Sequence, residues 1–313
     1  MNILCPNGLH VGVFQGLDGS LCRHHFIVPR KETPVDVHDG WDVGARTKPS
    51  NVISKVLDWN GDYDCILVQS AQDWCNLPNQ IRNSKPIIYY ELMNGRGTKA
   101  GFEPIYTHKN TILGFVSNSC RISHGIFDEP HFTLFPGVNE DDWNAQKLNL
   151  VSHDIPQIVH ARNDFAIRDT KKYADFLQVV DGLDYRILGR GGNANFVSFQ
   201  EQAETFIRSR LYLNIEIYCS TFSIAAMEGM MASLPIVSND IEGSADFIRN
   251  GTNGFVNTNL SKLRNHCIAL LNDKPMADKL GEKARETAIQ AFGKHQFNEA
   301  VNYVFDNLKG YQK

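Results

Sequence analysis

The stretch that decides the fold runs from residue 220 to residue 256 and reads STFSIAAMEGMMASLPIVSNDIEGSADFIRNGTNGFV. It follows the apolar and aromatic run Leu211–Cys219, which is typical of a buried strand. Ser220 and Thr221 carry hydroxyls suited to capping a helix over residues 224–232. Residues 234–238 and 255–256 are β-branched or apolar and predict two further strands. This order predicts a βαβ unit within an α/β fold.

The predicted helix has one charged residue in otherwise apolar surroundings. Its other faces carry mostly Met and Ala, so the helix is expected to be packed on all sides. Burying the carboxylate of Glu228 costs several kcal/mol unless donors or hydroxyls meet it, and a bound ligand can supply them. The backbone amides of Thr221, Phe222 and Ser223 lie between a strand end and a helix. Free amides at a helix N-terminus point the same way and attract an anion. The sequence therefore predicts a phosphate site with Glu228 beside it.

The same stretch resembles the C-terminal signature of family-4 glycosyltransferases, which have the GT-B fold and use nucleotide sugars. The matching positions are Glu228, Met231-Ala232, Pro235-Ile236-Val237, Gly243 and Asn253-Gly254. The resemblance assigns Glu228 to the ribose hydroxyls of the nucleotide. One position departs from the family, because Ser220 stands where the first of two paired glutamates would fall. The fold expected from the resemblance is GT-B: two Rossmann-like domains facing across a cleft, with a C-terminal helix that crosses back onto the first.

Composition sets only broad limits on the class of protein. The chain has 313 residues, 42% of them hydrophobic, which is enough for two domains with their own cores. Its net charge of −4 implies no general attraction to nucleic acid or anionic membranes. Seven cysteines without paired CxxC spacing favour free thiols in a reducing compartment. No apolar run reaches the length of a membrane span and the first residues read as a strand, so we expect a cytoplasmic protein.

The N-terminal half reads as an alternating α/β pattern. Predicted strands cover residues 3–6, 24–29, 65–68, 86–90 and 112–116. Gly12 lies in a glycine-bearing segment after the first strand, where doubly wound folds bring phosphates close to the backbone. The segment matches no G-x-G-x-x-G fingerprint, and glycines that only shorten a loop are the alternative.

The domain boundary is predicted near the polar residues 140–152. Phe132–Asn139 resembles the linker strand of the family. We therefore expect an N-terminal domain on the acceptor side over residues 1–145 and a nucleotide-sugar-binding domain over residues 146–295. Residues 296–313 are expected to form the helix that returns to the first domain.

Two cations of the second domain are candidates for binding the donor diphosphate. In the family an Arg and, a few residues on, a Lys neutralise this group; Arg162 matches the first and Lys171 the second, with Arg168 competing for that role. Arg and Lys suit a pyrophosphate that gains charge as the glycosidic bond breaks. A basic, solvated helix start is the alternative. Gly189 and Gly191 resemble the Gly-x-Gly turn of the family.

The family also places a His in the first domain near the sugar, and the matching region Tyr89–Asn94 contains none. Glu91 lies close to that position, where a carboxylate could orient a sugar hydroxyl or the acceptor; a partly exposed strand-end Glu is the ordinary alternative. His108 and His124 are predicted to be structural or surface histidines. Family-4 enzymes are retaining and need neither a metal nor a cofactor, and the chain shows no Asp-x-Asp metal motif in the expected place.

These features together predict a retaining glycosyltransferase that moves a sugar from a nucleotide-diphosphate sugar to an acceptor. Open acceptor classes are a glycan, a lipid-linked sugar, a protein, a small molecule and a modified nucleic-acid base. A hydrolytic or epimerising GT-B enzyme, or a non-catalytic sugar-nucleotide-binding protein, is the alternative.

Overall fold

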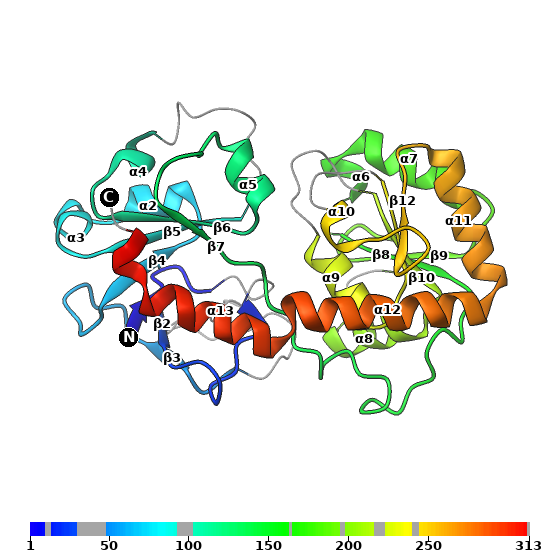
Figure 1. Cartoon of the computed structure of the whole chain (residues 1–313), viewed down its shortest axis with the longest axis horizontal. Helices are drawn as coiled ribbons and strands as arrows, with labels where there is room; N and C mark the ends of the chain where they lie inside the picture. Colours follow the sequence, from blue (N-terminus) through cyan, green and yellow to red (C-terminus); the bar gives the residue numbers. More distant parts are fainter. Residues whose placement is uncertain are drawn as a thin grey trace. The chain divides into compact units, whose positions relative to one another are not determined.

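The computed structural model describes residues 1–9, 14–29, 48–92, 103–162, 165–194, 198–215, 223–239 and 244–311 (Figure 1). They form two compact units. The first unit is Met1–Val138 with Lys294–Lys313, and the second unit is Asn139–Gly293. Each contains one parallel β-sheet, so the predicted α/β class is confirmed.

The first unit has a seven-stranded sheet in the order β3-β2-β1-β4-β5-β6-β7, with every pair parallel. Its strands are β1 Asn2–Leu4, β2 His25–Pro29, β3 Val52–Lys55, β4 Cys65–Val68, β5 Ile87–Glu91, β6 Thr111–Phe115 and β7 His131–Thr133. Its helices are α2 Ala71–Asn76, α3 Asn79–Ser84, α4 Glu103–Thr107, α5 Asn118–Ser123, α13 Lys294–Asp306 and the 3-10 helix η2 Leu308–Tyr311. Every residue of β4, β5 and β6 is buried, as expected for the centre of a parallel sheet covered on both faces.

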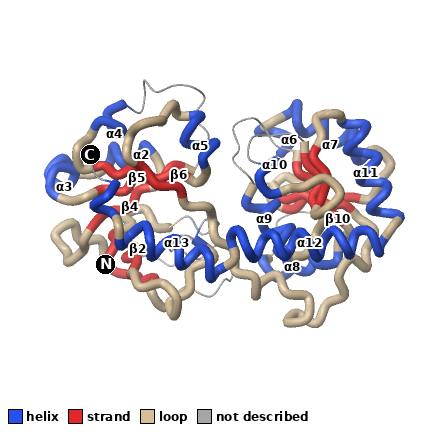
Figure 2. The backbone as a smooth tube through the Cα atoms, in the orientation of Figure 1, coloured by secondary structure: helices blue, strands red, loops and turns tan. Residues whose placement is uncertain are grey.

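The second unit has a five-stranded parallel sheet in the order β12-β11-β10-β8-β9. Its strands are β8 Ile158–Ala161, β9 Tyr185–Leu188, β10 Leu211–Asn214, β11 Ile236–Ser238 and β12 Gly254–Val256. Its helices are α6 Phe165–Arg168, α7 Thr170–Val180, α8 Phe199–Arg208, α9 Ile224–Met231, α10 Ser244–Phe247, α11 Leu260–Asn272 and α12 Lys274–Phe292. Helices α7 and α11 pack on one face of this sheet, and α9 and α12 pack together on the other (Figures 1 and 2).

Helix α9 is apolar and buried, as predicted, and its end is fixed by a close approach of α12. The helix stops where Ser233 adopts a φ of 67° and Leu234 N–H donates to the carbonyl of Gly229 at 2.9 Å. A Cβ on Gly281 of α12 would lie only 1.8 Å from the carbonyl oxygen of Ser233. Glycine is therefore required at position 281 for α12 to pack against the end of α9.

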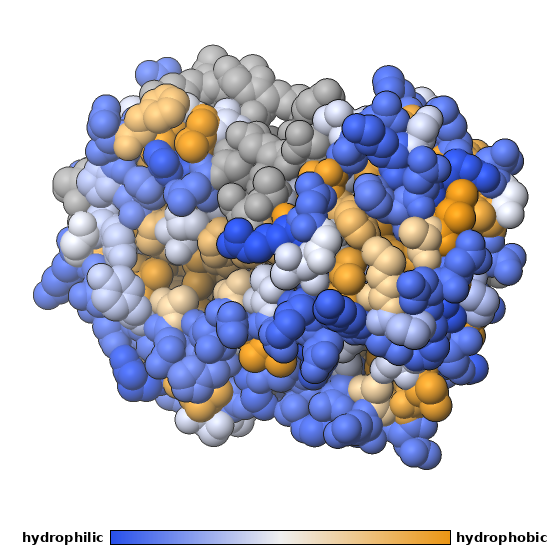
Figure 3. All heavy atoms as spheres, turned by 45° about the vertical axis from the view of Figure 1, so that its right-hand side comes forward, coloured by the Kyte–Doolittle hydropathy of each residue, from blue (hydrophilic) through white to orange (hydrophobic). Residues whose placement is uncertain are grey.

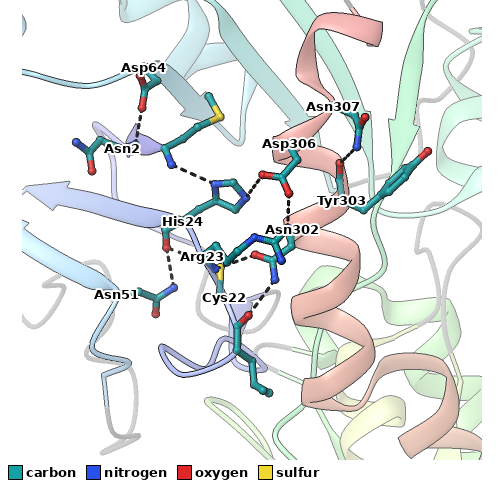
Figure 4. Close-up of polar contacts among 12 residues, drawn as sticks. Asn2, Cys22, Arg23, His24, Asn51, Asp64, Asn302, Tyr303, Asp306 and Asn307 are labelled. Carbon is teal, nitrogen blue, oxygen red and sulfur yellow. Dashed lines mark hydrogen bonds and ion pairs between the residues drawn. The ribbon is translucent and has the colours of Figure 1, made fainter.

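Helix α13 belongs to the first unit, and its polar side chains bind the backbone of residues 16–23; Figure 4 shows the part of this contact around Asn302 and Arg23. Asn298 Nδ2 donates to the carbonyl of Gly16 at 2.8 Å, and its Oδ1 accepts from the amide of Asp18 at 3.1 Å. One turn later, Asn302 Oδ1 accepts from the amide of Arg23 at 2.8 Å, and Nδ2 donates to the carbonyl of Leu21 at 2.9 Å. These residues lie four apart, which places them on one face of the helix. We call the pair the asparagine ladder.

The sequence predictions differ from the structure in four places. Strand β3 was not predicted. The strand predicted over Leu211–Cys219 ends at Asn214 in the structure, and residues 216–222 lie outside the described residues. The N-cap of α9 is Ser223, beyond the hydroxyls proposed to cap it. The first unit ends at Val138 and resumes at Lys294, whereas the predicted domains were 1–145, 146–295 and 296–313.

Candidate functional site

The sheet of the second unit has a topological switch point between β8 and β10. After β8 the chain adds β9 on one side, and β10 then pairs with β8 on the other side. In open parallel sheets, ligands bind beyond the carboxyl ends of the strands at such a point. Arg162 follows β8, Gly189 follows β9, and helix α9 follows the loop after β10. The structure therefore brings four predicted features to one edge: Arg162, the glycine turn, the start of α9 and Glu228.

Glu228 lies in the second turn of α9 and is buried, with 5% of its surface exposed. Gln202 Nε2, from α8, donates a hydrogen bond to Glu228 Oε2 at 3.1 Å. Burial of this carboxylate among methionines was predicted from the sequence, and an amide donor from another helix partly offsets its desolvation.

The first turn of α9 leaves backbone amides available for an anion. Ser223 occupies the N-cap position, and its side chain makes no capping hydrogen bond. The first intrahelical bond runs from the amide of Met227 to the carbonyl of Ser223 at 3.0 Å, so the amides of residues 224–226 have no acceptor within the helix. Of the predicted phosphate-site residues, Ser220, Thr221, Phe222 and Gly12 lie outside the described residues.

Arg162 and the glycine turn are adjacent in the sheet. The amide of Arg162 donates to the carbonyl of Leu188 at 2.9 Å, which ties the end of β8 to the end of β9. Its guanidinium carbon lies 5.2 Å from the ring centroid of Phe165. Gly189 and Gly191 have φ values of 114° and 74°, which side chains rarely tolerate. The predicted Gly-x-Gly turn is thus a genuine left-handed turn beside Arg162.

The turn after β9 is also closed by an asparagine. Asn193 Oδ1 accepts from the amide of Ile187 at 2.7 Å, and its Nδ2 donates to the carbonyl of Tyr185 at 3.2 Å. A Cβ on Gly192 would lie 2.1 Å from the carbonyl oxygen of Ile187. The backbone therefore folds back tightly on β9 and presents the turn at the edge of the sheet.

The lysines at the start of α7 are placed differently from each other. The side chain of Lys171 is 80% exposed, and its Nζ lies 3.3 Å from Asp175 on the same helix. The side chain of Lys172 is only 18% exposed and contacts Asp175 at the same distance. Asp169 caps α7 by accepting the amide of Lys172 at 3.0 Å. Arg168 ends α6, and its side chain is not among those described.

His160 lies directly beneath the switch point and is fully buried. Its Nδ1 donates to the carbonyl of Leu213 at 2.9 Å, which links β8 to β10 through a side chain. Burial, reinforced by the positive charge of Arg162, lowers the pKa of His160 to about 4. The imidazole is therefore neutral near pH 7. Asn214, at the end of β10, donates from Nδ2 to Ser238 Oγ on β11 at 3.2 Å and continues this polar row.

Glu91 ends β5 of the first unit and is 8% exposed, so it is buried rather than a partly exposed strand-end residue. The hydroxyl of Tyr89 donates to Glu91 Oε2, and the amide of Leu92 donates to Oε1 at 3.0 Å. His124 Nε2 lies 4.0 Å from Oε2. His124 is itself buried, consistent with the predicted structural histidine.

Within the described residues there is no group of three His, Cys, Asp or Glu side chains arranged to hold a metal ion. None of the helices in the described ranges is long and apolar enough to cross a membrane. Hydrophilic residues cover most of the face drawn in Figure 3, and apolar residues interrupt them in smaller groups.

Sequence reasoning missed three residues in this part of the second unit. Lys172 could have been found from the apolar register of α7, because Phe176 and Val180 lie four and eight residues after it. Gln202 follows the capping box formed by Ser198 and Glu201, but nothing in the sequence indicates that it reaches Glu228. His160 is visible in the sequence only as a polar residue that follows the apolar pair Ile158 and Val159.

Comparison with known proteins agrees with this geometry. Residues 181–287 match the family model described as "Glycosyl transferases group 1". The match begins just before β9 and includes α9 with Glu228. This part of the chain is therefore similar to the glycosyltransferases of group 1.

Two curated relatives match parts of the chain. A poly(ribitol-phosphate) alpha-N-acetylglucosaminyltransferase of Staphylococcus aureus is 30% identical over 87 residues, covering 27% of this chain and 18% of the relative. An uncharacterised glycosyltransferase of Methanocaldococcus jannaschii is 29% identical over 113 residues, covering 36% of this chain and 32% of the relative. Each match thus spans less than a third of the relative's length.

The fold is shared over nearly the whole chain. The Anabaena protein HepE, solved in complex with UDP-glucose, superposes with a TM-score of 0.68 at 12% identity, covering 98% of this chain and 99% of that one. A Rickettsia africae glycosyltransferase gives a TM-score of 0.66 at 14% identity, covering 98% of each chain. The predicted GT-B fold is therefore confirmed.

Proposed function

We propose that the chain is a retaining, family-4-type glycosyltransferase whose second unit binds a nucleotide-diphosphate sugar. The observation that carries this proposal is the buried carboxylate of Glu228 on the helix that follows β10 at the switch point. A carboxylate in that place accepts hydrogen bonds from the vicinal hydroxyls of a ribose, and the glycosyltransferase group 1 match covers it.

The diphosphate is proposed to bind the free amides of α9, the glycine turn at 189–191 and the guanidinium of Arg162. A helix N-terminus and a cation together favour an anion whose charge grows as the glycosidic bond breaks, so they stabilise the transition state more than the ground state. We assign the second cation to Lys172 rather than Lys171, because Lys172 is held against the body of the unit and Lys171 extends into solvent.

A donor with a uridine base is the first choice for a test, because the Anabaena protein of the same fold was solved with UDP-glucose. Calorimetry of the full chain with UDP should give binding at sub-millimolar concentration. Absence of binding by UDP, GDP and ADP would reject the proposal. A donor-hydrolysis assay without acceptor separates transfer from the hydrolytic and epimerising alternative.

We further propose that transfer needs no divalent metal, since Arg162, Lys172 and helix amides supply positive charge at the diphosphate. Sugar transfer or donor hydrolysis should then persist in excess EDTA. Complete loss on chelation that magnesium restores would contradict this mechanism.

A further inference from the structure

A buried network of polar side chains surrounds Glu91 in the first unit. Its members come from three elements: Tyr89 from β5, Tyr106 from α4, and Cys120 and His124 from α5 with its C-cap. Each of these four side chains is at most 5% exposed. The donor site proposed above lies in the second unit and uses none of these side chains.

The contacts fix the carboxylate from two directions. From β5, the hydroxyl of Tyr89 and the amide of Leu92 each donate to one carboxylate oxygen. From α5, His124 Nε2 faces the carboxylate at 4.0 Å, while His124 Nδ1 lies 2.7 Å from the hydroxyl of Tyr106. Burial, reinforced by the charge of Glu91, raises the pKa of Tyr106, so this hydroxyl keeps its proton. In the tautomer in which the hydroxyl donates to Nδ1, the ring proton of His124 lies on Nε2, toward Glu91.

The backbone of Glu91 is held by the same neighbouring elements. Its carbonyl accepts the amide of Val116, after β6, at 3.0 Å, and Cys120 Sγ lies 3.7 Å from the same oxygen. Ser117 caps α5 by accepting the amide of Cys120 at 3.0 Å, which fixes the helix at the end of β6. Both the main chain and the side chain of Glu91 are therefore held in one position.

The position of Glu91 in the sheet distinguishes it from an ordinary buried side chain. A buried carboxylate costs more than an amide of the same size, and glutamine could accept the same hydrogen bond from Tyr89. Glu91 stands at the carboxyl edge of a parallel sheet, the edge at which doubly wound folds bind ligands, and about a tenth of its side chain is exposed, 10%. A fixed carboxylate that keeps a small exposed area can accept a hydrogen bond from a ligand hydroxyl.

We propose that His124 and Tyr106 are positioning residues that hold the Glu91 carboxylate to accept a hydrogen bond from a hydroxyl of a saccharide acceptor bound to the first unit. This inference rests on the proposed function and narrows the acceptor to a saccharide, as in a glycan or a lipid-linked sugar. No proton transfer is involved, because the carboxylate acts only as a hydrogen-bond acceptor.

The test measures saccharide binding separately from nucleotide binding. Saturation-transfer NMR of the full chain with methyl glucoside, methyl mannoside, methyl galactoside and methyl N-acetylglucosaminide should give a signal from at least one of them. Glu91→Gln and His124→Phe should each weaken that binding about tenfold, the usual effect of losing or misdirecting a hydrogen bond to a charged group. His124→Gln, which keeps an N–H donor, should retain most of it, and Tyr106→Phe should give an intermediate loss. UDP binding should be unchanged in all four variants.

The matched control is His108→Phe, which replaces a histidine just after α4 whose ring contacts Trp74 at 5.5 Å. It should bind saccharide as the unaltered protein does. The inference is overturned if His124→Phe also binds normally, if His124→Gln and His124→Phe lose binding equally, or if a protein that binds UDP binds none of the glycosides. It is also overturned if Glu91→Gln weakens UDP-glucose binding without acceptor, because Glu91 would then serve the donor. Failure of the unaltered protein to bind any nucleotide rejects the proposed function instead.

Discussion

Replacing Glu228 by glutamine tests the ribose role with almost no change in side-chain size. In the folded protein Gln202 donates to Oε2 at 3.1 Å, and it can still donate to the amide oxygen of the variant. The other carboxylate oxygen becomes an NH2 group, which cannot accept a hydrogen bond from a ribose hydroxyl. The variant therefore loses one acceptor and the charge that strengthens the other.

Losing charge-assisted hydrogen bonds of this kind weakens binding by roughly 1–3 kcal/mol, or about 5- to 150-fold in the Kd for UDP. Folding stability should change by less than about 1 kcal/mol, because removing a buried charge offsets the loss of its partners. Calorimetry with UDP and with inorganic pyrophosphate separates the two halves of the site. Pyrophosphate has no ribose, so its affinity should not change.

Glu286→Gln, on the exposed side of α12, is the matched control and should leave UDP affinity unaltered. Two results would refute the reasoning. If Glu228→Gln unfolds at a much lower temperature but binds UDP normally while folded, the carboxylate is structural. If UDP and pyrophosphate weaken equally, Glu228 acts on the phosphates and not on the ribose.

Two further predictions concern the same edge of the sheet. Lys172→Ala should lower turnover at least tenfold with little change in stability, because charge on the leaving diphosphate grows in the transition state. Lys171→Ala should have little effect on turnover. Equal losses of turnover in steady-state assays of the two variants would contradict the assignment. Burial lowers the pKa of His160 to about 4, so below the unfolded value near 6.5 the unfolded state takes up a proton that the folded state does not. The free energy of unfolding should therefore fall by about 3 kcal/mol between pH 6.5 and pH 4. Chemical denaturation at several pH values should show that His160→Gln lacks this dependence of stability on pH. An unchanged dependence in the variant would assign the acid sensitivity to other groups.

The sequence predicted most of the fold because its central strands are short apolar runs bounded by turn residues. β4 lies where it was predicted, and most of the other predicted strands are shifted by one or two residues. β3, with the sequence Val-Ile-Ser-Lys, was missed because only its first residue is buried, so it carries little apolar signal. The strand predicted to reach Cys219 stops at Asn214, where its pairing with β11 ends. The prediction was too long because hydrophobicity alone does not reveal where strand pairing ends.

The candidate site was predictable only in part, for a physical reason. Glu228 was conspicuous because a single carboxylate in an apolar helix conflicts with its surroundings, and that conflict can be read locally. Its donor Gln202 lies on another helix, and the network that holds Glu91 joins three separate elements. Such long-range contacts leave no local pattern. The choice between Lys171 and Lys172 likewise depends on which side of α7 faces the core.

The asparagine ladder has a consequence for the order in which the chain acquires its structure during synthesis. The second unit is one continuous stretch, Asn139–Gly293, and can fold once its last residue has left the ribosome. The first unit is interrupted, because Asn298 and Asn302 bind the backbone of residues 16–23 only after the whole second unit has been made. Until then Phe14 and Phe26 lack the rings of Phe297 and Phe305 that pack against them. The half of the protein that is translated first is therefore the half that is completed last, and a chaperone that holds nascent chains would act on that half.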